Sequence, residues 1–468
     1  MTRMVAILPI LPAIGSLIWL VVMLLGSGLL WAFSRRSRRL VIAFIKSQWR
    51  GLVVLVGIGA TLPTIHSISV RALTEPSPKS PPSPIAFIPE GWPTSRGSLA
   101  RLGSDGTRGP HSGGVNWVGR RDYVFFSSPA ICGEYVVAIG SRGDSARCFC
   151  WDVATGAEVW NAGPQDFRMT LSSPILADGR IFCGEGVHHT PRARVIGLDP
   201  ASSNEDGVAW EFSTTSHVEC TPAFDNGRVF VAAGDDGVYC FETDPRRPAE
   251  QRVRWHIPGT QLPDAETALA VHAGRVYVGL GHGGNAMVAL SAETGHELSR
   301  AALPLPVFSP PAIFGDGLLI GLGPGNLVNA PTAGAGEIRL LDLESLQTRW
   351  SLPTTASVLS APAVVGDEAV VCVADGHVLV VDQSGSVRRQ WRSPSPILTS
   401  PAVSLDTIYC VDAEGVLVAL DLQRMEPIWQ VRLGPSGLYV SSPVVARGRI
   451  VVGTPEGLMC VGTIPQGN

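Results

Sequence analysis

The stretch TPAFDNGRVFVAAGDDGVYCFETD, residues 221–244, decides the fold class of this chain. Its two runs rich in Val, Phe and Tyr are separated by Asp-Asp-Gly, and Asn-Gly precedes the first run. Asn-Gly and Asp-Gly supply the positive φ angles that tight hairpins need, and such turns between β-prone runs are typical of antiparallel strands. The stretch therefore predicts short strands joined by tight turns.

The same pattern recurs along most of the chain. Each copy begins with a small residue and Pro, continues through two apolar runs separated by Gly turns, and often ends in Trp. The anchors are spaced by 39 to 51 residues and are Pro129, Pro174, Pro222, Leu269, Pro311, Pro362, Pro401 and Pro443. Units of this length cannot bury their own apolar face, so they form propellers or arrays. Four strands per unit predict an all-β, eight-bladed β-propeller of four-stranded antiparallel blades.

Tryptophan marks the last strand of most units. The residues are Trp160, Trp210, Trp255, Trp350, Trp391 and Trp429, and Leu298 stands at this place in the fourth unit. The eighth unit, residues 441–462, stops before such a strand, whereas VNWVGRR (115–121) carries Trp117 in register ahead of the first unit. We predict that residues 114–121 complete the last blade, because this closure removes the open sheet edges that invite aggregation.

A family resemblance rests on these repeats. WDVATGAEVW (151–160) resembles the Asp-x-x-Thr-Gly-x-x-x-Trp repeat of PQQ-like (pyrrolo-quinoline quinone) propellers, and looser copies lie at 290–298, 341–350, 381–391 and 420–429. GWPTSRGSLARLG (91–103) is similar to the lead-in found upstream of such propellers. The resemblance covers residues 91–463. The family includes quinoprotein alcohol and glucose dehydrogenases and BamB-type scaffolds of outer-membrane barrel assembly.

The resemblance also implies what a quinoprotein enzyme would need: a vicinal Cys-Cys pair, an acidic residue and an Asn as Ca²⁺ ligands, and an Asp base. None of the nine cysteines adjoins another, the nearest pair being Cys148 and Cys150, and no position matches the Ca²⁺ ligands or the base. Hydrolase, zinc-protease and P-loop motifs are also absent from the sequence. We predict no catalytic and no cofactor-binding residues, with PQQ and Ca²⁺ as the alternative.

The first 74 residues differ in composition from the rest. Residues 5–33 and 51–70 are apolar stretches long enough to cross a bilayer, which takes about 20 helical residues. The segment between them, 34–50, carries six Arg or Lys and no acidic residue, which predicts a cytoplasmic loop by the positive-inside rule. We predict an uncleaved two-helix anchor in the cytoplasmic (inner) membrane with the propeller on the extracytoplasmic, periplasmic side. A single signal-like helix at 51–70 after an interfacial segment is the alternative.

Composition restricts the partners. Residues 75–90 are rich in Pro and Ser and predict a semi-extended tether, and residues 464–468 form a short tail. Residues 1–74 carry eight Lys or Arg and no Asp or Glu, so the remaining chain has 28 basic against 40 acidic residues. This acidic balance argues against nucleic acid as a partner, because binding to its backbone needs a basic surface.

Three loops are longer than the other turns of the repeat: 184–195, 279–287 and 321–338. By blade topology they emerge at one end of the ring, and loops carry binding function more often than strands do. We predict protein-binding loops that use His188, His189, Arg192, Arg194, Asn326 and Asn329. We predict no metal site. His188 and His189 are the candidate ligands if one exists, but adjacent loop histidines are usually solvated. His217 either lines the central channel or is a hydrogen-bonded structural residue.

Two recurring residue types have structural interpretations. Asp199, Asp342, Asp382 and Asp421 precede the Trp strand, where an Asp can bond backbone N–H groups two residues on, so we predict turn caps. The cysteines occupy repeat positions that hold small apolar residues in other units, so we predict that they pack in the core.

The sequence thus predicts a membrane-anchored propeller that is not an enzyme. Its partners would be other envelope proteins, bound by a scaffold in envelope or outer-membrane protein assembly. The alternative is a degenerate quinoprotein-like oxidoreductase or a small-ligand sensor.

Overall fold

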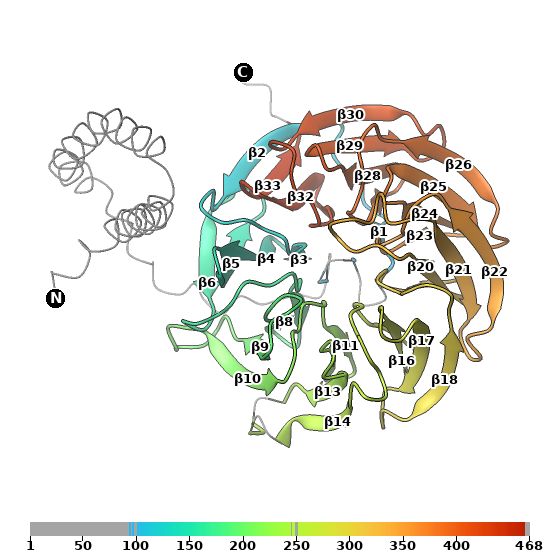
Figure 1. Ribbon diagram of the computed structural model, residues 1–468. Helices are drawn as coiled ribbons and strands as arrows, with labels where there is room; N and C mark the ends of the chain where they lie inside the picture. The colour runs from blue at the N-terminus through green and yellow to red at the C-terminus, as the bar shows by residue number, and fades with distance from the viewer. Residues whose placement is uncertain (1–92, 95, 98–100, 245, 249–250, 464–468) are drawn as a thin grey trace, which may run out of the picture. The chain divides into compact units, whose positions relative to one another are not determined.

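Eight antiparallel sheets surround a central channel (Figure 1). The computed structural model describes residues 93–94, 96–97, 101–244, 246–248 and 251–463, and no α-helix lies in this part of the chain. Within it, then, no helix is long and apolar enough to cross a membrane. The predicted anchor helices at 5–33 and 51–70, the loop 34–50, the tether 75–90 and the tail 464–468 lie outside the described residues. The predicted all-β, eight-bladed propeller is confirmed.

Each blade is one four-stranded meander, numbered from the channel outward. Blades 1 to 4 consist of β3 (Ala130–Cys132), β4 (Tyr135–Arg142), β5 (Ser145–Asp152), β6 (Glu158–Ala162); β7 (Ile175–Ala177), β8 (Arg180–Gly184), β9 (Ala193–Leu198), β10 (Val208–Thr214); β11 (Ala223–Asp225), β12 (Arg228–Ala232), β13 (Val238–Glu242), β14 (Val253–Ile257); and β15 (Ala270–His272), β16 (Arg275–Leu280), β17 (Ala286–Ser291), β18 (Glu297–Ala302).

Blades 5 to 8 continue the series. They consist of β19 (Ala312–Phe314), β20 (Gly317–Leu322), β21 (Gly336–Asp342), β22 (Thr348–Thr354); β23 (Ala363–Val365), β24 (Glu368–Cys372), β25 (His377–Asp382), β26 (Val387–Arg392); β27 (Ala402–Ser404), β28 (Thr407–Val411), β29 (Val416–Asp421), β30 (Pro427–Arg432); and β31 (Val444–Ala446), β32 (Arg449–Thr454), β33 (Gly457–Gly462), β2 (Gly114–Gly119).

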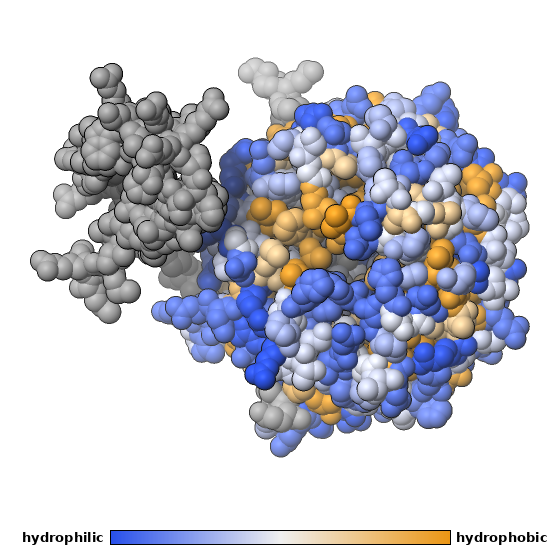
Figure 2. All heavy atoms as spheres, viewed as in Figure 1, coloured by the Kyte–Doolittle hydropathy of each residue, from blue (hydrophilic) through white to orange (hydrophobic). Residues whose placement is uncertain are grey.

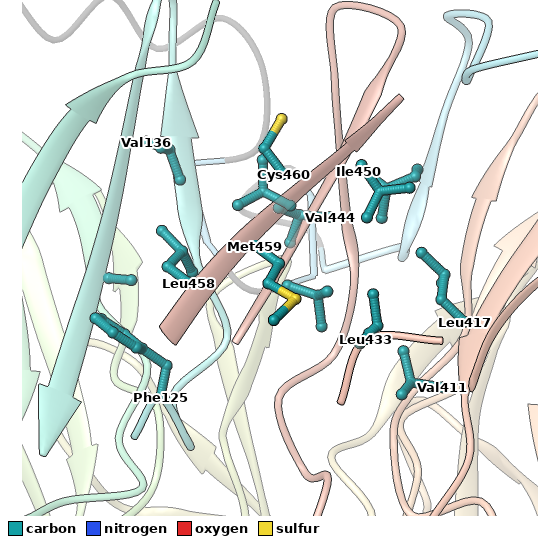
Figure 3. Packing of buried hydrophobic residues seen from close by; sticks show 14 of the residues in the cluster. Phe125, Val136, Val411, Leu417, Leu433, Val444, Ile450, Leu458, Met459 and Cys460 are labelled. Carbon is teal, nitrogen blue, oxygen red and sulfur yellow. The ribbon is translucent and has the colours of Figure 1, made fainter. Parts of the chain in front are cut away.

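The last blade joins the two ends of the propeller sequence. Strand β2 pairs antiparallel with β33, and Trp117 lies opposite Cys460, so the predicted completion of blade 8 by residues 114–121 is confirmed. Figure 3 shows how this blade packs. Leu458 points toward Phe125 and toward Val136 of blade 1, and Met459 points toward Leu433 and toward Val411 of blade 7. Closure therefore buries apolar side chains on both faces of the final sheet.

The outer tryptophans connect neighbouring blades. The indole N–H of Trp117 donates to the carbonyl of Val153 in the next blade at 2.9 Å, and Trp255, Trp350 and Trp429 make the corresponding bonds to Ala292, Gln383 and Pro110. A Cβ on Gly156, which has a φ of 72°, would lie 2.5 Å from Cγ of Trp117. The repeat therefore needs the glycine of its Thr-Gly pair, because glycine leaves room for the indole of the preceding blade.

The recurring aspartates cap their own turns, as predicted. The carboxylate of Asp382 accepts the backbone N–H groups of Ser384 at 2.8 Å and Ser386 at 3.0 Å, and Asp199, Asp342 and Asp421 bond their own turns in the same way. Bonds from the Ser384 hydroxyl and from backbone N–H groups lower the pKa of the Asp382 carboxyl to about 2, although slight burial acts against them. The packing role of the cysteines is also confirmed: none of the nine forms a disulfide, and all but Cys220 are buried.

Hydroxyl groups form a ring of hydrogen bonds around the channel, one residue before most of the anchors. In each participating blade, the backbone N–H of the residue before the anchor donates to the Ser or Thr hydroxyl at the same position of the next blade. The bonds run from Ala361 to Ser400, Ser400 to Ser442, Ser442 to Ser128, Ser128 to Ser173, and Ser173 to Thr221, at 2.8 to 3.3 Å. Blades 4 and 5 have Ala268 and Pro310 at this position, and blade 6 has Ala361, so none of the three offers a hydroxyl. We call this set of bonds the hydroxyl ring.

The lead-in before blade 1 lies inside the channel. Strand β1 (Ser104–Asp105) adds to the inner edge of β27, parallel to it. The Arg96 guanidinium donates to the carbonyls of Pro362 and Pro401 at 2.8 Å each, and Arg101 donates to those of Thr221 and Pro222. Burial lowers the pKa of Arg96 to about 9 and that of Arg101 to about 10. The chain thus fills part of its own channel and ties blades 3, 6 and 7 together.

We predict that Trp117→Ala lowers the free energy of unfolding by about 3 kcal/mol, the usual cost of deleting a packed aromatic ring. The substitution removes the indole's contact with Gly156 and its bond to Val153, and both hold blade 8 to blade 1. Denaturant unfolding followed by circular dichroism measures the change. Val115→Ala, at a more exposed site on the same strand, is the control and should cost about 0.5 kcal/mol or less. Equal effects of the two substitutions would contradict a docking role for Trp117.

We also predict a pH-dependent contribution from Asp382. Because its pKa in the folded protein is about 2, below the ordinary range of an aspartate, its stabilising effect is complete above the unfolded-state pKa and disappears as the pH falls through the folded-state pKa. Asp382→Ala should therefore destabilise the propeller at pH 6, and the difference from the unaltered protein should shrink between pH 4 and about pH 2. Urea unfolding across this range tests the trend, with the exposed Asp367→Ala as control. A constant difference at all pH values would refute the assignment.

Candidate functional site

A cavity of about 510 Å³ lies where the channel opens among the long loops. Every blade contributes one wall residue from the same repeat position, three residues before the anchor. These eight residues, which we call the channel ring, are Phe126, Leu171, Glu219, Glu266, Phe308, Leu359, Leu398 and Val440. Six are apolar, and the two glutamates stand side by side on blades 3 and 4. Arg96 and Arg101 of the lead-in also line the cavity.

The three long loops meet at this cavity, which confirms that they emerge at one end of the ring. His188 and His189 come from loop 184–195, His282 from loop 279–287, and Asn326 to Val328 from loop 321–338. Val328 is 87% exposed and Leu438 is 40% exposed, although both are apolar. Figure 2 shows one face of the propeller, on which apolar residues gather toward the centre and hydrophilic residues cover much of the rim.

The predicted loop residues differ in what they do. Asn326 accepts the backbone N–H of Val328 at 2.9 Å, and Asn329 accepts that of Asn326 at 2.9 Å, so both side chains shape their own loop. Arg192 is exposed. Arg194 is tied to its own blade: it forms ion pairs with the buried Glu185 and with Asp166 and Glu211. Its bonds with Glu185 raise the pKa of Arg194. Arg194 therefore stiffens the base of the loop.

Four side chains from three consecutive blades converge at the cavity wall. They are His188 on the blade 2 loop, His217 and Glu219 before β11, and Glu266 before β15, and one potential ligand atom from each lies within 4.8 Å of the others. Nδ1 of His188 lies 2.7 Å from Oε1 of Glu266, and Nε2 of His217 lies 3.1 Å from the same oxygen. The backbone N–H of His188 donates to Glu219 at 2.7 Å. We call these residues the His–Glu cluster.

Burial and neighbouring charges set the electrostatics of the His–Glu cluster. Burial raises the pKa of Glu219, although His217 acts against it. At Glu266 burial also acts to raise the pKa, but contacts with His217 and Asp264 outweigh it and the pKa is lowered. Burial and the neighbouring Glu266 raise the pKa of Asp264. For His217, burial acts to lower the pKa, but the contact with Glu266 prevails and the pKa is raised. Burial thus makes the charged form of both glutamates costly, and contacts with His217 offset part of that cost.

Of the four cluster residues, the sequence pattern pointed to His188 and His217 but not to Glu219 or Glu266. A signal was present: when the eight units are aligned on their anchors, the channel-ring position is apolar in all units except the third and fourth. His217 is buried and is not among the residues that line the cavity, and its Nδ1 lies 3.2 Å from the Ser216 hydroxyl, so it fits the second of its two interpretations, a hydrogen-bonded structural residue. His189 packs against His188 with ring centroids 4.3 Å apart but does not belong to the cluster.

The residues at this cavity do not match those that the family resemblance implies for binding a quinone. The vicinal cysteine pair that the resemblance implies has no counterpart, since Cys220 is the one thiol among the described residues that lines the cavity. Burial raises the pKa of Cys220 well above its usual range. Cys148 and Cys150 are buried within blade 1. We therefore derive no redox step.

Comparison with known proteins supports the resemblance. A family model described as "Outer membrane protein assembly factor BamB" matches residues 247–396 and 388–468. Proteins named outer membrane protein assembly factor BamB are 31% identical over 134 residues in Marinobacter adhaerens, covering 27% of this chain and 32% of the relative, and 24% identical over 163 residues in Bordetella pertussis, covering 34% and 42%. This chain is a PQQ-like, BamB-like propeller.

Solved structures agree with the BamB-like fold. BamB from Moraxella catarrhalis superimposes with a TM-score of 0.55 at 15% identity, covering 75% of this chain and 97% of that one. Quinohemoprotein alcohol dehydrogenase from Comamonas testosteroni gives a TM-score of 0.63 at 11% identity, covering 82% of both chains. At such identities the likeness shows the fold alone. The matched part spans between 32% and 42% of the length of the curated relatives.

Proposed function

We propose that this BamB-like propeller is a non-enzymatic, membrane-anchored scaffold that binds other envelope proteins, in outer-membrane protein assembly or a related process. The observation that carries the proposal is the mouth of the channel, where an apolar cavity opens between loops with exposed aliphatic side chains. Exposed apolar surface with a polar rim marks a binding surface. The matches to outer membrane protein assembly factors support the choice of process.

The shape of the site favours a peptide segment as the bound group. Six apolar members of the channel ring surround the cavity, whose volume of about 510 Å³ falls within the range of ordinary binding pockets. Val328 and Leu438 stand at its rim, where they could pack against the flanks of an inserted segment. Full burial of an exposed aliphatic side chain contributes roughly 1.5–3 kcal/mol before the costs of association. Val328 would contribute most of this amount, and the partly covered Leu438 less.

The proposed membrane anchor would determine on which side of the membrane the channel mouth meets its partners. We propose that the apolar stretches 5–33 and 51–70 hold the chain in the cytoplasmic membrane with the propeller on the extracytoplasmic side, because the basic residues lie between them. The Pro-rich segment 75–90 would then keep the channel mouth free to meet partners at some distance from the bilayer. The acidic balance of residues 75–468 is consistent with protein partners and not with nucleic acid.

We expect a specific envelope protein to be recovered when the full-length chain is cross-linked with a membrane-impermeant reagent applied from the extracytoplasmic side, purified and analysed by mass spectrometry. The double variant Val328→Glu/Leu438→Glu should reduce that recovery at least tenfold, because charge opposes burial of the rim.

The matched control is Leu298→Glu, which places the same charge on an exposed aliphatic residue of outer strand β18. It should leave recovery unchanged. Recovery of the protein alone, or equal loss with the control, would refute a scaffold that uses the channel mouth. Failure of the impermeant reagent to reach the propeller would refute the proposed location.

A further inference from the structure

We propose that His188, His217, Glu219 and Glu266 bind one divalent transition-metal ion of the zinc type, which ties loop 184–195 to blades 3 and 4 at the channel mouth. This site is separate from the partner-binding proposal, since it needs no second protein. The inference rests on the donor set, on the burial of His217, and on the place of the cluster in the ring of blades.

The donor set suits a transition metal. Two imidazole nitrogens and two carboxylates are common zinc ligands, with bonds of about 2.0–2.2 Å and tetrahedral geometry in structural sites. Such bonds put ligand atoms about 3.3 Å apart, and the spacings from Glu266 to the His188 and His217 nitrogens are 2.7 and 3.1 Å. Small shifts would thus convert the present contacts into a coordination shell. Ca²⁺ and Mg²⁺ instead prefer six or more oxygen ligands, which this set does not offer.

His217 provides independent support. It is 5% exposed, and its Nε2 has no aligned hydrogen bond within the described part of the chain, although Glu266 lies nearby. A buried ring nitrogen without a well-formed hydrogen bond is costly unless something else binds it. Its other nitrogen, Nδ1, lies 3.2 Å from the hydroxyl of Ser216. That contact fixes the ring in the way that outer contacts orient metal-bound histidines, and it leaves Nε2 facing the other ligands.

The backbone around the cluster is shaped to hold it. Gly234 has a φ of 53°, and a Cβ there would lie 2.6 Å from Cε1 of His217, so only glycine leaves room for this ring. The backbone N–H of His188 holds one oxygen of Glu219 at 2.7 Å. Asp264 accepts the backbone N–H of Gly283 at 3.2 Å and stands beside Glu266. Neighbouring loop and turn residues thus hold His217, Glu219 and Glu266 in place.

The location gives the ion a structural task. The hydroxyl ring links blades 6, 7, 8, 1, 2 and 3 but is interrupted after Thr221, because blade 4 has Ala268 at the next position. Glu219 of blade 3 and Glu266 of blade 4 lie two residues before these positions on the same inner segments. An ion between them would bridge the blades at the point where the hydroxyl ring lacks a bond. It would also offset the burial of two carboxylates side by side.

Zinc binding to purified, tag-free, full-length protein tests the proposal. After stripping with a chelator, we expect about one Zn²⁺ per chain by competition with a fluorescent zinc indicator, and a higher unfolding temperature when Zn²⁺ is added, because the ion binds only the folded state. His188→Ala and Glu266→Gln should each weaken zinc binding at least tenfold. His188 is exposed and Gln is isosteric with Glu, so both variants should remain folded.

His282→Ala is the matched control, since this histidine lines the same cavity but stands outside the cluster. It should bind zinc as the unaltered protein does. The proposal is overturned if the unaltered protein binds far less than one Zn²⁺ per chain, if the ligand variants bind as tightly as the control, or if Ca²⁺ competes equally for the site. Each result is independent of any partner, so failure here leaves the proposed scaffold function unaffected.

Discussion

The hydroxyl ring is the interaction on which the rest of the structure depends. In a propeller each blade is too small to bury its own faces, so stability comes from contacts between neighbours. At the channel these contacts are backbone N–H groups donating to the Ser or Thr hydroxyl of the next blade, from Ala361 round to Thr221. At the periphery, indoles such as Trp117 repeat the connection through carbonyls of the next blade. Because β2 supplies the last outer strand, both layers run across the junction of blade 8 with blade 1, where the propeller closes.

The interruption of the ring coincides with the most distinctive chemistry of the molecule. At the junction of blades 3 and 4, where the hydroxyl ring ends because Ala268 offers no hydroxyl, the channel ring carries Glu219 and Glu266, and His217 is buried beside them. On the opposite arc the lead-in adds a second connection between blades 6 and 7, since Arg96 bonds the carbonyls of Pro362 and Pro401. The channel is thus stabilised by three means: hydroxyl groups, buried guanidinium groups and the His–Glu cluster. The cavity that remains open is bounded mainly by the six apolar members of the channel ring and by the three long loops.

Sequence reasoning predicted the fold almost completely and the site only in part. The eight anchors and the Trp strands recur every 39 to 51 residues, so blade number, strand order and closure by residues 114–121 followed from local pattern alone. The three long loops were placed correctly because blade topology determines at which end each turn emerges. Arg194 was predicted to be available for partners, yet it pairs with Glu185, 9 residues earlier in the chain, because the loop folds back on its own blade. Glu219 and Glu266 are 47 residues apart, and the packing of blade 3 against blade 4 brings them together, so each alone looks like an ordinary charged residue.

Hydrogen exchange of the metal-free protein, resolved by mass spectrometry of peptides, tests the central claim most directly. If the hydroxyl ring holds the blades together, amides in the inner segments around Ser128, Ser400 and Ser442 should exchange only through global unfolding, whereas the segments around Ala268 and Pro310 should exchange faster through local opening. Equal exchange in the two sets of segments, or faster exchange around Ser442 than around Ala268, would contradict the account.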